Sequence, residues 1–84
     1  MQYFYTARFL RSLKKCEEAV QDDVFRAVQL FEKGESNEIL KLHKLHGKFK
    51  SYHAFSANFS YRVIIKMGKD AVYYADIGTH DIYS

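Results

Sequence analysis

The sequence predicts an α+β fold of two layers, in which a short N-terminal strand and a helical hairpin are followed by a three-stranded antiparallel sheet. Two observations support this fold. Apolar residues recur at helical spacing in the first half of the chain, and they alternate with polar residues in the second half. A helical hairpin must bury its apolar stripe against another element, and the sheet provides that surface. Because the chain has 84 residues, we expect one domain that spans residues 1–84.

The first half of the chain is expected to form the strand and the two helices. Residues 3–5 read as the strand, and Thr6 is a suitable N-cap for a helix that continues to about Lys15. A second helix is expected at residues 17–33, and Gly34 is placed to end it. The apolar stripe of this second helix consists of Val20, Val24, Ala27, Val28 and Phe31.

The second half is expected to form the sheet, with strands at residues 49–57, 60–67 and 71–77 and a turn at residues 68–70. In the middle strand, alternation puts Val63 and Ile65 on the side of the helices. Arg62 then points to the opposite side of the sheet, which we expect to be exposed and concave. Along the last strand, strict alternation separates Tyr73, Ala75 and Ile77 from Val72, Tyr74 and Asp76.

Charge is strongly segregated along the chain, although the formal net charge is only +3. Residues 39–69 contain seven lysines and arginines and no acidic residue, whereas residues 17–38 contain seven acidic residues. The sequence therefore predicts one positive face, which is typical of proteins that bind a polyanion or an acidic protein. The alternative is a solvated basic loop, but histidines and aromatic residues interleave with these lysines.

Other features bear on location and cofactors. Cys16 is the only cysteine, so the chain forms no internal disulfide, and we expect this thiol to be a small buried side chain. The sequence shows no signal-peptide pattern and no apolar run long enough to cross a membrane. We therefore expect a cytoplasmic protein without a membrane partner. Four histidines occur, but no cysteine or carboxylate cluster completes a metal site, so we expect neither metal nor cofactor.

Three segments carry residues that are suited to cleaving RNA. They read Leu42-His43-Lys44-Leu45-His46-Gly47, Tyr61-Arg62-Val63-Ile64-Ile65 and Ile77-Gly78-Thr79-His80-Asp81-Ile82-Tyr83. Arginine binds phosphate, histidine transfers protons near neutral pH, and an aromatic ring stacks on a base. His80 is the most informative of these residues, because a histidine after a Gly-Thr turn at an exposed sheet edge has little reason to be there for packing.

In their order and spacing, these segments resemble the RelE/ParE toxin superfamily of type II toxin–antitoxin systems, and within it most of all the YafQ-type branch. The resemblance covers nearly the whole chain. It implies an mRNA interferase, a metal-independent endoribonuclease that enters the ribosomal A site and cuts the mRNA there. It also implies that a cognate antitoxin protein silences the toxin by covering the basic concave face.

The resemblance implies a role for each matching residue. His43 is the general base, His80 is the general acid, and Arg62 stabilises charge on the phosphate. Tyr83 matches an aromatic residue that stacks on a base or orients it. His53 falls near a lysine used by RelE-like members and receives a secondary role in proton transfer or charge stabilisation. The residues expected to bind or position RNA are His46, Lys48 and Lys50.

Two residues depart from the branch, and several roles have structural alternatives. Ser56 and Ser60 stand where YafQ-type members carry a histidine and an aspartate, which leaves the activity open. The alternatives are a solvated loop position for His43, an ion pair of Arg62 with Asp76, a turn cap for Asp81, core packing for Tyr83, and simple solubility for Lys48 and Lys50.

Two further functions stay open beside RNA cleavage. A ParE-like inhibitor of DNA gyrase has the same fold, although such members generally lack the histidine pair. A catalytically degenerate homologue that only binds its antitoxin is compatible with Ser56 and Ser60. The pair of His43 and His80 favours the nuclease over the gyrase inhibitor.

Overall fold

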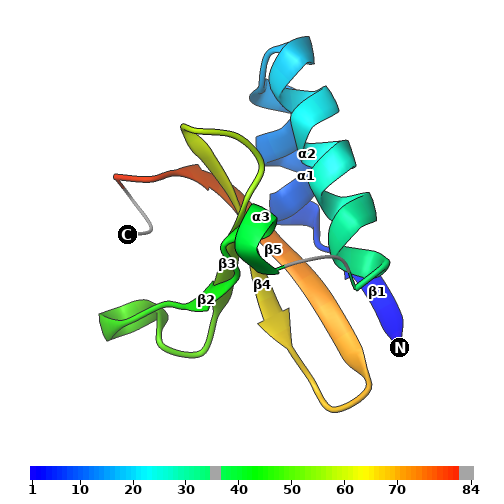
Figure 1. Cartoon of the computed structure of the whole chain (residues 1–84), viewed down its shortest axis with the longest axis vertical. Coiled ribbons are helices and arrows are strands. Elements are labelled where there is room, and N and C mark those ends of the chain that lie inside the picture. The colour runs from blue at the N-terminus through cyan, green and yellow to red at the C-terminus, as the bar shows by residue number, and fades with distance from the viewer. Residues whose placement is uncertain (35–36, 82–84) are drawn as a thin grey trace.

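The computed structural model describes residues 1–34 and 37–81, and it has the expected α+β architecture. Two helices pack against one face of a five-stranded mixed sheet with the strand order β1-β5-β4-β3-β2 (Figure 1). The elements of the first half are β1 (Gln2–Tyr5), α1 (Ala7–Lys15), α2 (Glu18–Glu32) and the short α3 (Asn37–Leu40). The second half contains β2 (His43–Lys44), a 3₁₀ turn (Gly47–Phe49), β3 (His53–Ser56), β4 (Tyr61–Met67) and β5 (Ala71–Thr79).

The helices begin and end close to the predicted residues. The hydroxyl of Thr6 accepts a hydrogen bond from the amide of Phe9 at 3.2 Å, as an N-cap does. The same hydroxyl donates to the carbonyl of Tyr74 at 2.8 Å and so ties the start of α1 to β5. Gly34 follows α2 with a φ of 73°, a left-handed conformation that glycine adopts without strain.

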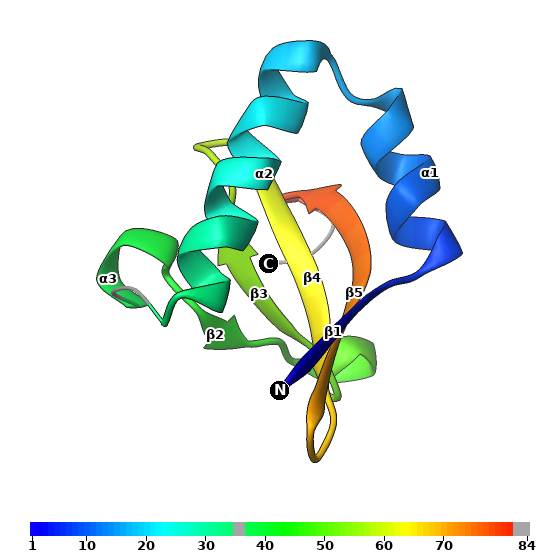
Figure 2. The same ribbon diagram turned by 90° about the vertical axis from the view of Figure 1, so that its right-hand side faces the viewer.

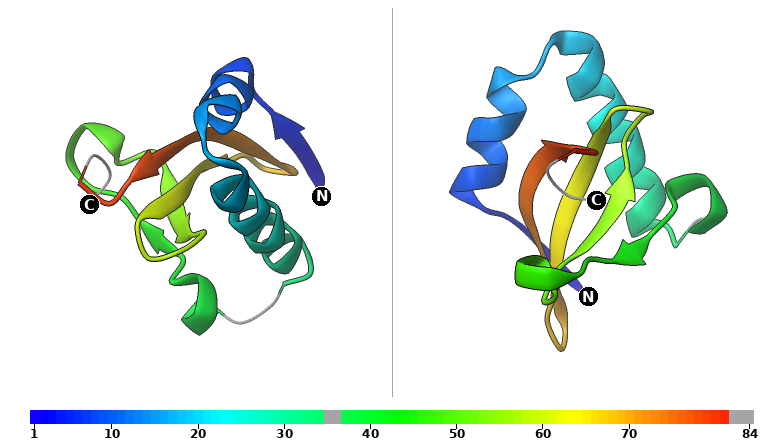
Figure 3. Two further views of the ribbon diagram at one scale, coloured as in Figure 1. Left: turned by 90° about the horizontal axis from the view of Figure 1, so that it is seen from above. Right: turned by 90° about the vertical axis from the view of Figure 1, so that its left-hand side faces the viewer.

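The main core lies between the helices and one side of the sheet, which we call the helix face. The helices and the sheet form separate layers when the molecule is seen from above and from the side (Figures 2 and 3). Val63 and Ile65 of β4 are both fully buried there, which confirms the alternation predicted for this strand. The rest of the buried cluster consists of Phe9, Val24, Ala27, Val28, Leu40, Phe55, Val72, Tyr74 and Ile77.

The opposite side of the sheet, which carries Arg62 and Ile64 and which we call the site face, is less exposed than expected. Residues 45–52 fold across it, and the 3₁₀ turn passes in front of the strands in the right-hand view of Figure 3. Leu45, Ala54 and Ile64 form a second buried cluster against which Phe49 and Tyr52 pack. The strand predicted at residues 49–57 therefore begins only at His53, because the preceding aromatic residues turn back to cover the sheet.

The last strand contains a β-bulge that strict alternation did not predict. Ile65 pairs with Tyr74 but Ile64 pairs with Asp76, so Ala75 is an extra residue in β5. Tyr74 and Ile77 consequently both join the helix-face core, which corrects the expectation that they lie on opposite faces. The bulge also brings the carboxylate of Asp76 to α1, where it accepts hydrogen bonds from Arg8 at 3.1 Å and Ser12 at 2.5 Å.

Three smaller findings complete the fold. The sheet gains two strands over the predicted three, since β1 pairs in parallel with β5 and β2 pairs with β3. Cys16 lies at the junction of α1 and α2, where partial burial raises the pKa of its thiol above the usual range. Within residues 1–34 and 37–81, no helix has both the length and the apolar composition needed to span a membrane.

Candidate active site

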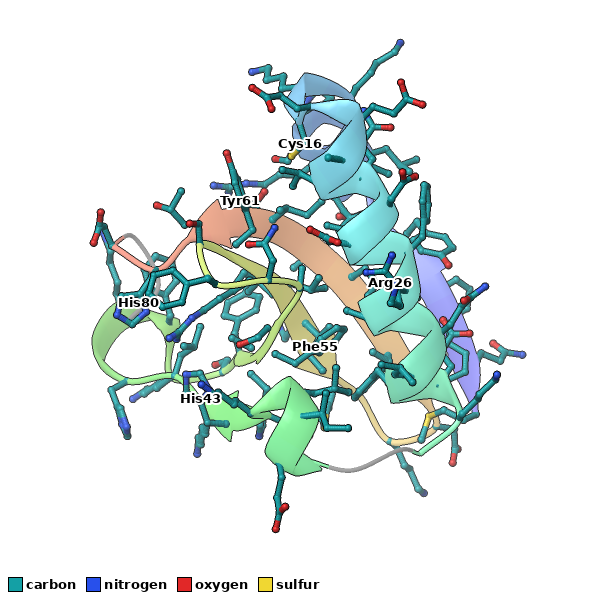
Figure 4. The ribbon with its side chains drawn as sticks, turned by 45° about the horizontal axis from the view of Figure 1, so that its top comes forward. Cys16, Arg26, His43, Phe55, Tyr61 and His80 are labelled. Atoms are coloured by element: carbon teal, nitrogen blue, oxygen red, sulfur yellow. The ribbon has the colours of Figure 1, made fainter. Side chains whose placement is uncertain are left out.

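The guanidinium of Arg62 lies between two histidine rings. Its Nη1 is 3.1 Å from Nε2 of His43, and its Nη2 is 2.5 Å from Nδ1 of His80. Both rings lie on the same side of the molecule in Figure 4, although they come from opposite ends of the second half of the chain. The structure therefore brings together the three residues to which the sequence assigned catalysis, and we call them the Arg–His cluster (His43, Arg62 and His80).

The strand register explains why these side chains share one face. His43 lies opposite Ala54 on β3, and Ala54 lies opposite Ile64 on β4. Directly opposed residues of antiparallel strands point to the same face, so His43 joins Ile64 and Arg62 on the site face. On the other flank, Arg62 lies opposite Gly78 of β5.

The hydrogen bonds of His43 select one tautomer of its neutral ring. A guanidinium has only donors, so Nε2 of His43 is placed to accept from Arg62. Nδ1 of the same ring is 2.8 Å from the carbonyl oxygen of Lys41, which only accepts, so the matching tautomer carries its proton on Nδ1. In that tautomer the Nε2 lone pair is directed into the site, as a general base requires. The Nδ1 atom of His80 likewise accepts from Arg62.

Lys41 holds the carbonyl that orients His43. It follows α3 directly, with a φ of 54°, in the left-handed region that side chains other than glycine seldom adopt. Holding such a residue there costs about 1–2 kcal/mol. Sequence reasoning missed this residue because its function is carried by a backbone atom and a turn, neither of which leaves a residue-type pattern.

The loop between β3 and β4, residues 57–60, positions His80. The backbone amide of His80 donates to the carbonyl of Ser60 at 3.1 Å. Asn58 fixes the loop, because its Oδ1 accepts from the amides of Ser60 and Tyr61, both at 2.8 Å. Its Nδ2 donates to the carboxylate of Asp23 on α2 at 3.0 Å, and this hydrogen bond lowers the pKa of Asp23 below its usual range. An asparagine between two predicted strands was the available signal for this turn.

A groove with a volume of about 870 Å³ runs between α2, α3 and residues 57–60, and it reaches Arg62 and His80. Its apolar lining comprises Ala27, Leu30, Ile39, Leu40, Ala57 and Phe59. Two of these apolar side chains are highly exposed to solvent, with exposed fractions of 67% for Ile39 and 101% for Phe59. Lys41 and Asp81 line the groove as well.

The remaining predicted site residues lie elsewhere. His53 is opposite Ile65 and so faces the helices, not Arg62, and its buried Nδ1 has no hydrogen-bond partner within the described part of the chain. The strand register thus separates it from the Arg–His cluster. His46, Lys48 and Lys50 are exposed on the segment that covers the site face, and the amine of Lys48 lies 5.3 Å from the centre of the Phe49 ring. Tyr83 lies outside the described residues.

The structural alternative for Arg62, an ion pair with Asp76, joins two residues that are not directly opposed in the register. Asp76 lies opposite Ile64, and its carboxylate is bound by Arg8 and Ser12 of α1. The cross-strand position next to Arg62 on β3 is Ser56, one of the two residues that depart from the YafQ-type pattern. Ser60, the other, contributes its carbonyl to the amide of His80.

The ligand types around the Arg–His cluster bear on metal binding. No group of three or more His, Cys, Asp or Glu side chains with a metal-binding arrangement occurs in residues 1–34 and 37–81. The two ring nitrogens that face each other are bridged by a permanently positive guanidinium, which repels a metal cation.

Solved structures provide the comparison with known proteins. YafQ from Escherichia coli strain BL21(DE3) superposes with a TM-score of 0.80 and 15% identity, covering 96% of this chain and 94% of that one. The toxin in the E. coli DinJ–YafQ toxin–antitoxin complex superposes with a TM-score of 0.77 and 16% identity over 96% and 93% of the two chains. The RelB–RelE antitoxin–toxin complex from Methanococcus jannaschii gives 0.75 and 12% identity over 94% and 92%.

These similarities establish the fold. The chain has the fold of RelE-like toxins, which confirms the architecture that the sequence motifs predicted. Neither a protein-family model nor a curated protein sequence matches the chain. The likeness is therefore one of three-dimensional structure at low sequence identity.

Proposed function

We propose that this chain is the toxin of a type II toxin–antitoxin pair and that it cleaves mRNA at the ribosome without a metal ion. The observation that carries the proposal is the position of the Arg62 guanidinium between Nε2 of His43 and Nδ1 of His80. Two proton-transferring groups on either side of a phosphate-binding cation are the parts that RNA cleavage by transesterification needs.

The reaction begins when a phosphate of the RNA backbone takes over the donors of Arg62. Two parallel N–H groups of a guanidinium match two phosphate oxygens, and charge-assisted hydrogen bonds of this kind are about twice as strong as neutral ones. The exchange releases the lone pairs of both histidine rings. The substrate thereby frees the base and the acid that act on it.

The neighbouring ribose 2′-hydroxyl then attacks the phosphorus. Nε2 of His43 takes the 2′-hydroxyl proton as the O2′–P bond forms, and the Lys41 carbonyl at 2.8 Å stabilises the resulting imidazolium. Arg62 offsets the charge that develops on the phosphoryl oxygens. His80, protonated once Nδ1 is released, delivers a proton to the departing 5′-oxygen as the P–O5′ bond breaks. The products are a 2′,3′-cyclic phosphate and a 5′-hydroxyl.

The contacts of the two rings favour this division of roles. His43 is partly buried and braced by a backbone carbonyl, which suits a base that must become a cation during the reaction. His80 is exposed at the end of β5, where it exchanges protons readily with solvent. The exposed lysines of residues 39–69 supply positive charge for the rest of the RNA, and Lys48, Lys50 and the exposed His46 are its proposed contact residues.

An acidic antitoxin is the proposed protein partner. Toxins with this fold are bound to antitoxins in the DinJ–YafQ and RelB–RelE complexes. The basic, partly apolar surface around the Arg–His cluster fits a segment that carries carboxylates and apolar side chains. A toxin that acts on ribosomes with such a partner is expected in the cytoplasm.

The test is inducible expression of the wild type and of His80→Ala, followed by primer extension on an abundant translated message. We expect in-frame cuts and growth arrest with the wild type and neither with His80→Ala. Phe25→Ala is the control, because this half-exposed residue of α2 lies outside the Arg–His cluster and the groove, so its loss should leave the cuts in place.

One result would contradict the role of His80, and two would contradict the nuclease itself. Undiminished cutting by a well-expressed His80→Ala protein would remove the acid role of His80. Growth arrest without cuts, together with DNA damage signalling, would identify a gyrase inhibitor. No arrest by the wild type, with antitoxin binding intact, would identify the degenerate binding module that Ser56 and Ser60 leave open.

A further inference from the structure

Phe59 is the most exposed large apolar side chain of the described residues. Its exposed fraction is 101%, so it makes almost no contact with the rest of the protein. A phenylalanine in this state leaves its whole ring hydrated, which is unfavourable by the general cost of exposing apolar surface. No packing role within the described fold accounts for the ring.

The backbone that carries Phe59 is held firmly. The Oδ1 of Asn58 accepts hydrogen bonds from the backbone amides of Ser60 and Tyr61, which follow Phe59. Its Nδ2 donates to the carboxylate of Asp23 on α2. The amides of Ala57 and Asn58 both donate to the carbonyl of Tyr61, at 2.9 and 3.3 Å. The ring is therefore presented on a fixed turn, and little backbone entropy is lost when a ligand stacks on it.

Phe59 shares the 870 Å³ groove with Arg62 and His80. The loop that carries Phe59 also contacts His80, the proposed general acid, because the carbonyl of Ser60 accepts a hydrogen bond from the backbone amide of His80. A backbone phosphate bound by Arg62 would thus place a neighbouring nucleotide in this groove. Its volume lies in the range of pockets that hold molecules of nucleotide size or somewhat larger.

We propose that Phe59 is a stacking platform for the nucleobase next to the scissile phosphate of single-stranded RNA. The inference rests on the proposed nuclease function and names the residue that holds the substrate beside the Arg–His cluster. Stacking uses the face that every base has, so the contact raises affinity for all sequences and does not select one base.

The charges around the groove suit an anionic occupant, and Phe59 fits RNA in particular because a nucleobase offers a flat face on which the ring stacks. Lys41, Arg62 and His80 line the groove close to the proposed phosphate position. The carboxylate of Asp23 is already bound by Asn58 and by Arg26 at 3.0 Å, so it presents less free negative charge to a phosphate. Asp81 is the exposed carboxylate at the His80 end of the groove.

The experiment measures cleavage of mRNA on purified translating ribosomes, as kcat/KM, for the wild type, Phe59→Ala and Phe59→Trp. Phe25→Ala is the matched control, because Phe25 is half exposed on α2 outside the groove. We expect Phe59→Ala to lower kcat/KM by roughly 10- to 100-fold at every cut site, as loss of one base–aromatic stack does. Phe59→Trp should retain the wild-type rate, and Phe25→Ala should leave it unchanged.

A second measurement follows binding without cleavage. Phe59→Trp is combined with His80→Ala, and its indole fluorescence is recorded as single-stranded oligoribonucleotide is added. The chain contains no natural tryptophan, so quenching reports stacking at this position alone. We expect quenching that weakens as salt is raised, because the neighbouring contact is to phosphate.

Each contrary outcome has its own meaning. Wild-type cleavage by Phe59→Ala, or an indole that RNA does not quench, overturns the stacking role and leaves the nuclease intact. Normal cleavage combined with loss of antitoxin binding overturns it in favour of a protein-docking residue. A wild-type protein that cuts nothing overturns the proposed function itself, and the stacking role with it.

Discussion

The helix face and the site face of the sheet are formed by alternate residues of the same strands, yet different forces hold them together. On the helix face, the buried ring of Tyr74 lies 5.0 to 6.4 Å from the ring centres of Tyr5, Phe9, Tyr3 and Phe31. On the site face, the small cluster of Leu45, Ala54 and Ile64 gives way to Arg62 and two histidines. Stability therefore resides mainly on one face and the proposed chemistry on the other, so substitutions should separate the two.

The largest effect is expected from Phe55→Ala, which tests whether the helix face carries the stability. Phe55 is fully buried and stacks on Phe31 at 4.8 Å between ring centres. Removing such a side chain costs about 3–5 kcal/mol, a large part of what a small domain has. Urea denaturation followed by circular dichroism measures this loss. Phe59→Ala is the exposed control, and an equal loss in both would contradict the division between the faces.

Arg62→Ala is expected to do the reverse, with a large effect on cleavage and a small one on folding. Losing one preorganised group that stabilises the transition state lowers kcat by roughly 100- to 1,000-fold. Arg62 is only partly buried, so the unfolding free energy should change by less than about 1 kcal/mol. Single-turnover cleavage and ribosome co-sedimentation measure the two effects. An equal loss of ribosome binding and cleavage would make Arg62 a binding residue.

Tyr74→Phe sharpens the comparison on the helix face by removing one hydrogen bond and keeping the ring. The hydroxyl of Tyr74 donates to Glu32 at 2.5 Å, and burial together with this carboxylate raises the pKa of Tyr74. The loss should be about 1.5–3 kcal/mol at neutral pH, the usual contribution of a hydrogen bond to a charged group.

The same substitution has a pH signature. Because the pKa is raised on folding, this stabilisation is complete below the unfolded pKa of about 10 and is lost as pH rises beyond it. The difference in unfolding free energy between wild type and Tyr74→Phe should therefore stay constant up to about pH 9 and shrink above about pH 10. A difference that stays constant above that pH as well would show that the hydroxyl contributes through packing alone.

The smallest effect is expected from Asn58→Ala, at the boundary between the two faces. Loss of its hydrogen bonds to the turn should cost about 1 kcal/mol and loosen the support of His80, lowering cleavage without abolishing it. Because Asn58 lowers the pKa of Asp23, its stabilisation is present above the unfolded pKa of about 4 and is lost as pH falls below it. Acid-induced unfolding of the wild type and of Asn58→Ala measures this pH dependence. Identical unfolding curves would contradict the stabilising contact between Asn58 and Asp23.

The elements that were predicted correctly are those with a long, regular pattern. The stripe around Val24 and Val28 and the alternation of Val63 with Ile65 each repeat often enough to specify a period. β2 has only two residues, which are too few to show an alternating pattern. The bulge at Ala75 interrupts the alternation of β5, and no unusual residue type marks it. The fold of residues 45–52 over the site face depends on distant partners such as Ile64, which local patterns do not encode.

The candidate site divides in the same way. His43, Arg62 and His80 were found from their spacing and their resemblance to a toxin superfamily, and the structure joins them through hydrogen bonds. Asn58 and Lys41 were not found, because one acts through a contact 35 residues away and the other through its carbonyl. His53 received its secondary role from the resemblance alone, and its place opposite Ile65 becomes known only when β3 is seen to begin at that residue.

The parallel pairing of β1 with β5 affects how the protein folds during its synthesis. Gln2 pairs with Ala71, and the hydroxyl of Thr6 donates to the carbonyl of Tyr74. β1 therefore cannot join the sheet until β5 has been synthesised. Contacts between such distant parts of a chain slow folding, because the entropy of closing a long loop is lost before the stabilising contacts can form. During synthesis, the helices emerge well before β5, and their apolar sides stay uncovered until it arrives. The nascent chain is thus without its completed sheet until almost all of residues 1–81 have left the ribosome.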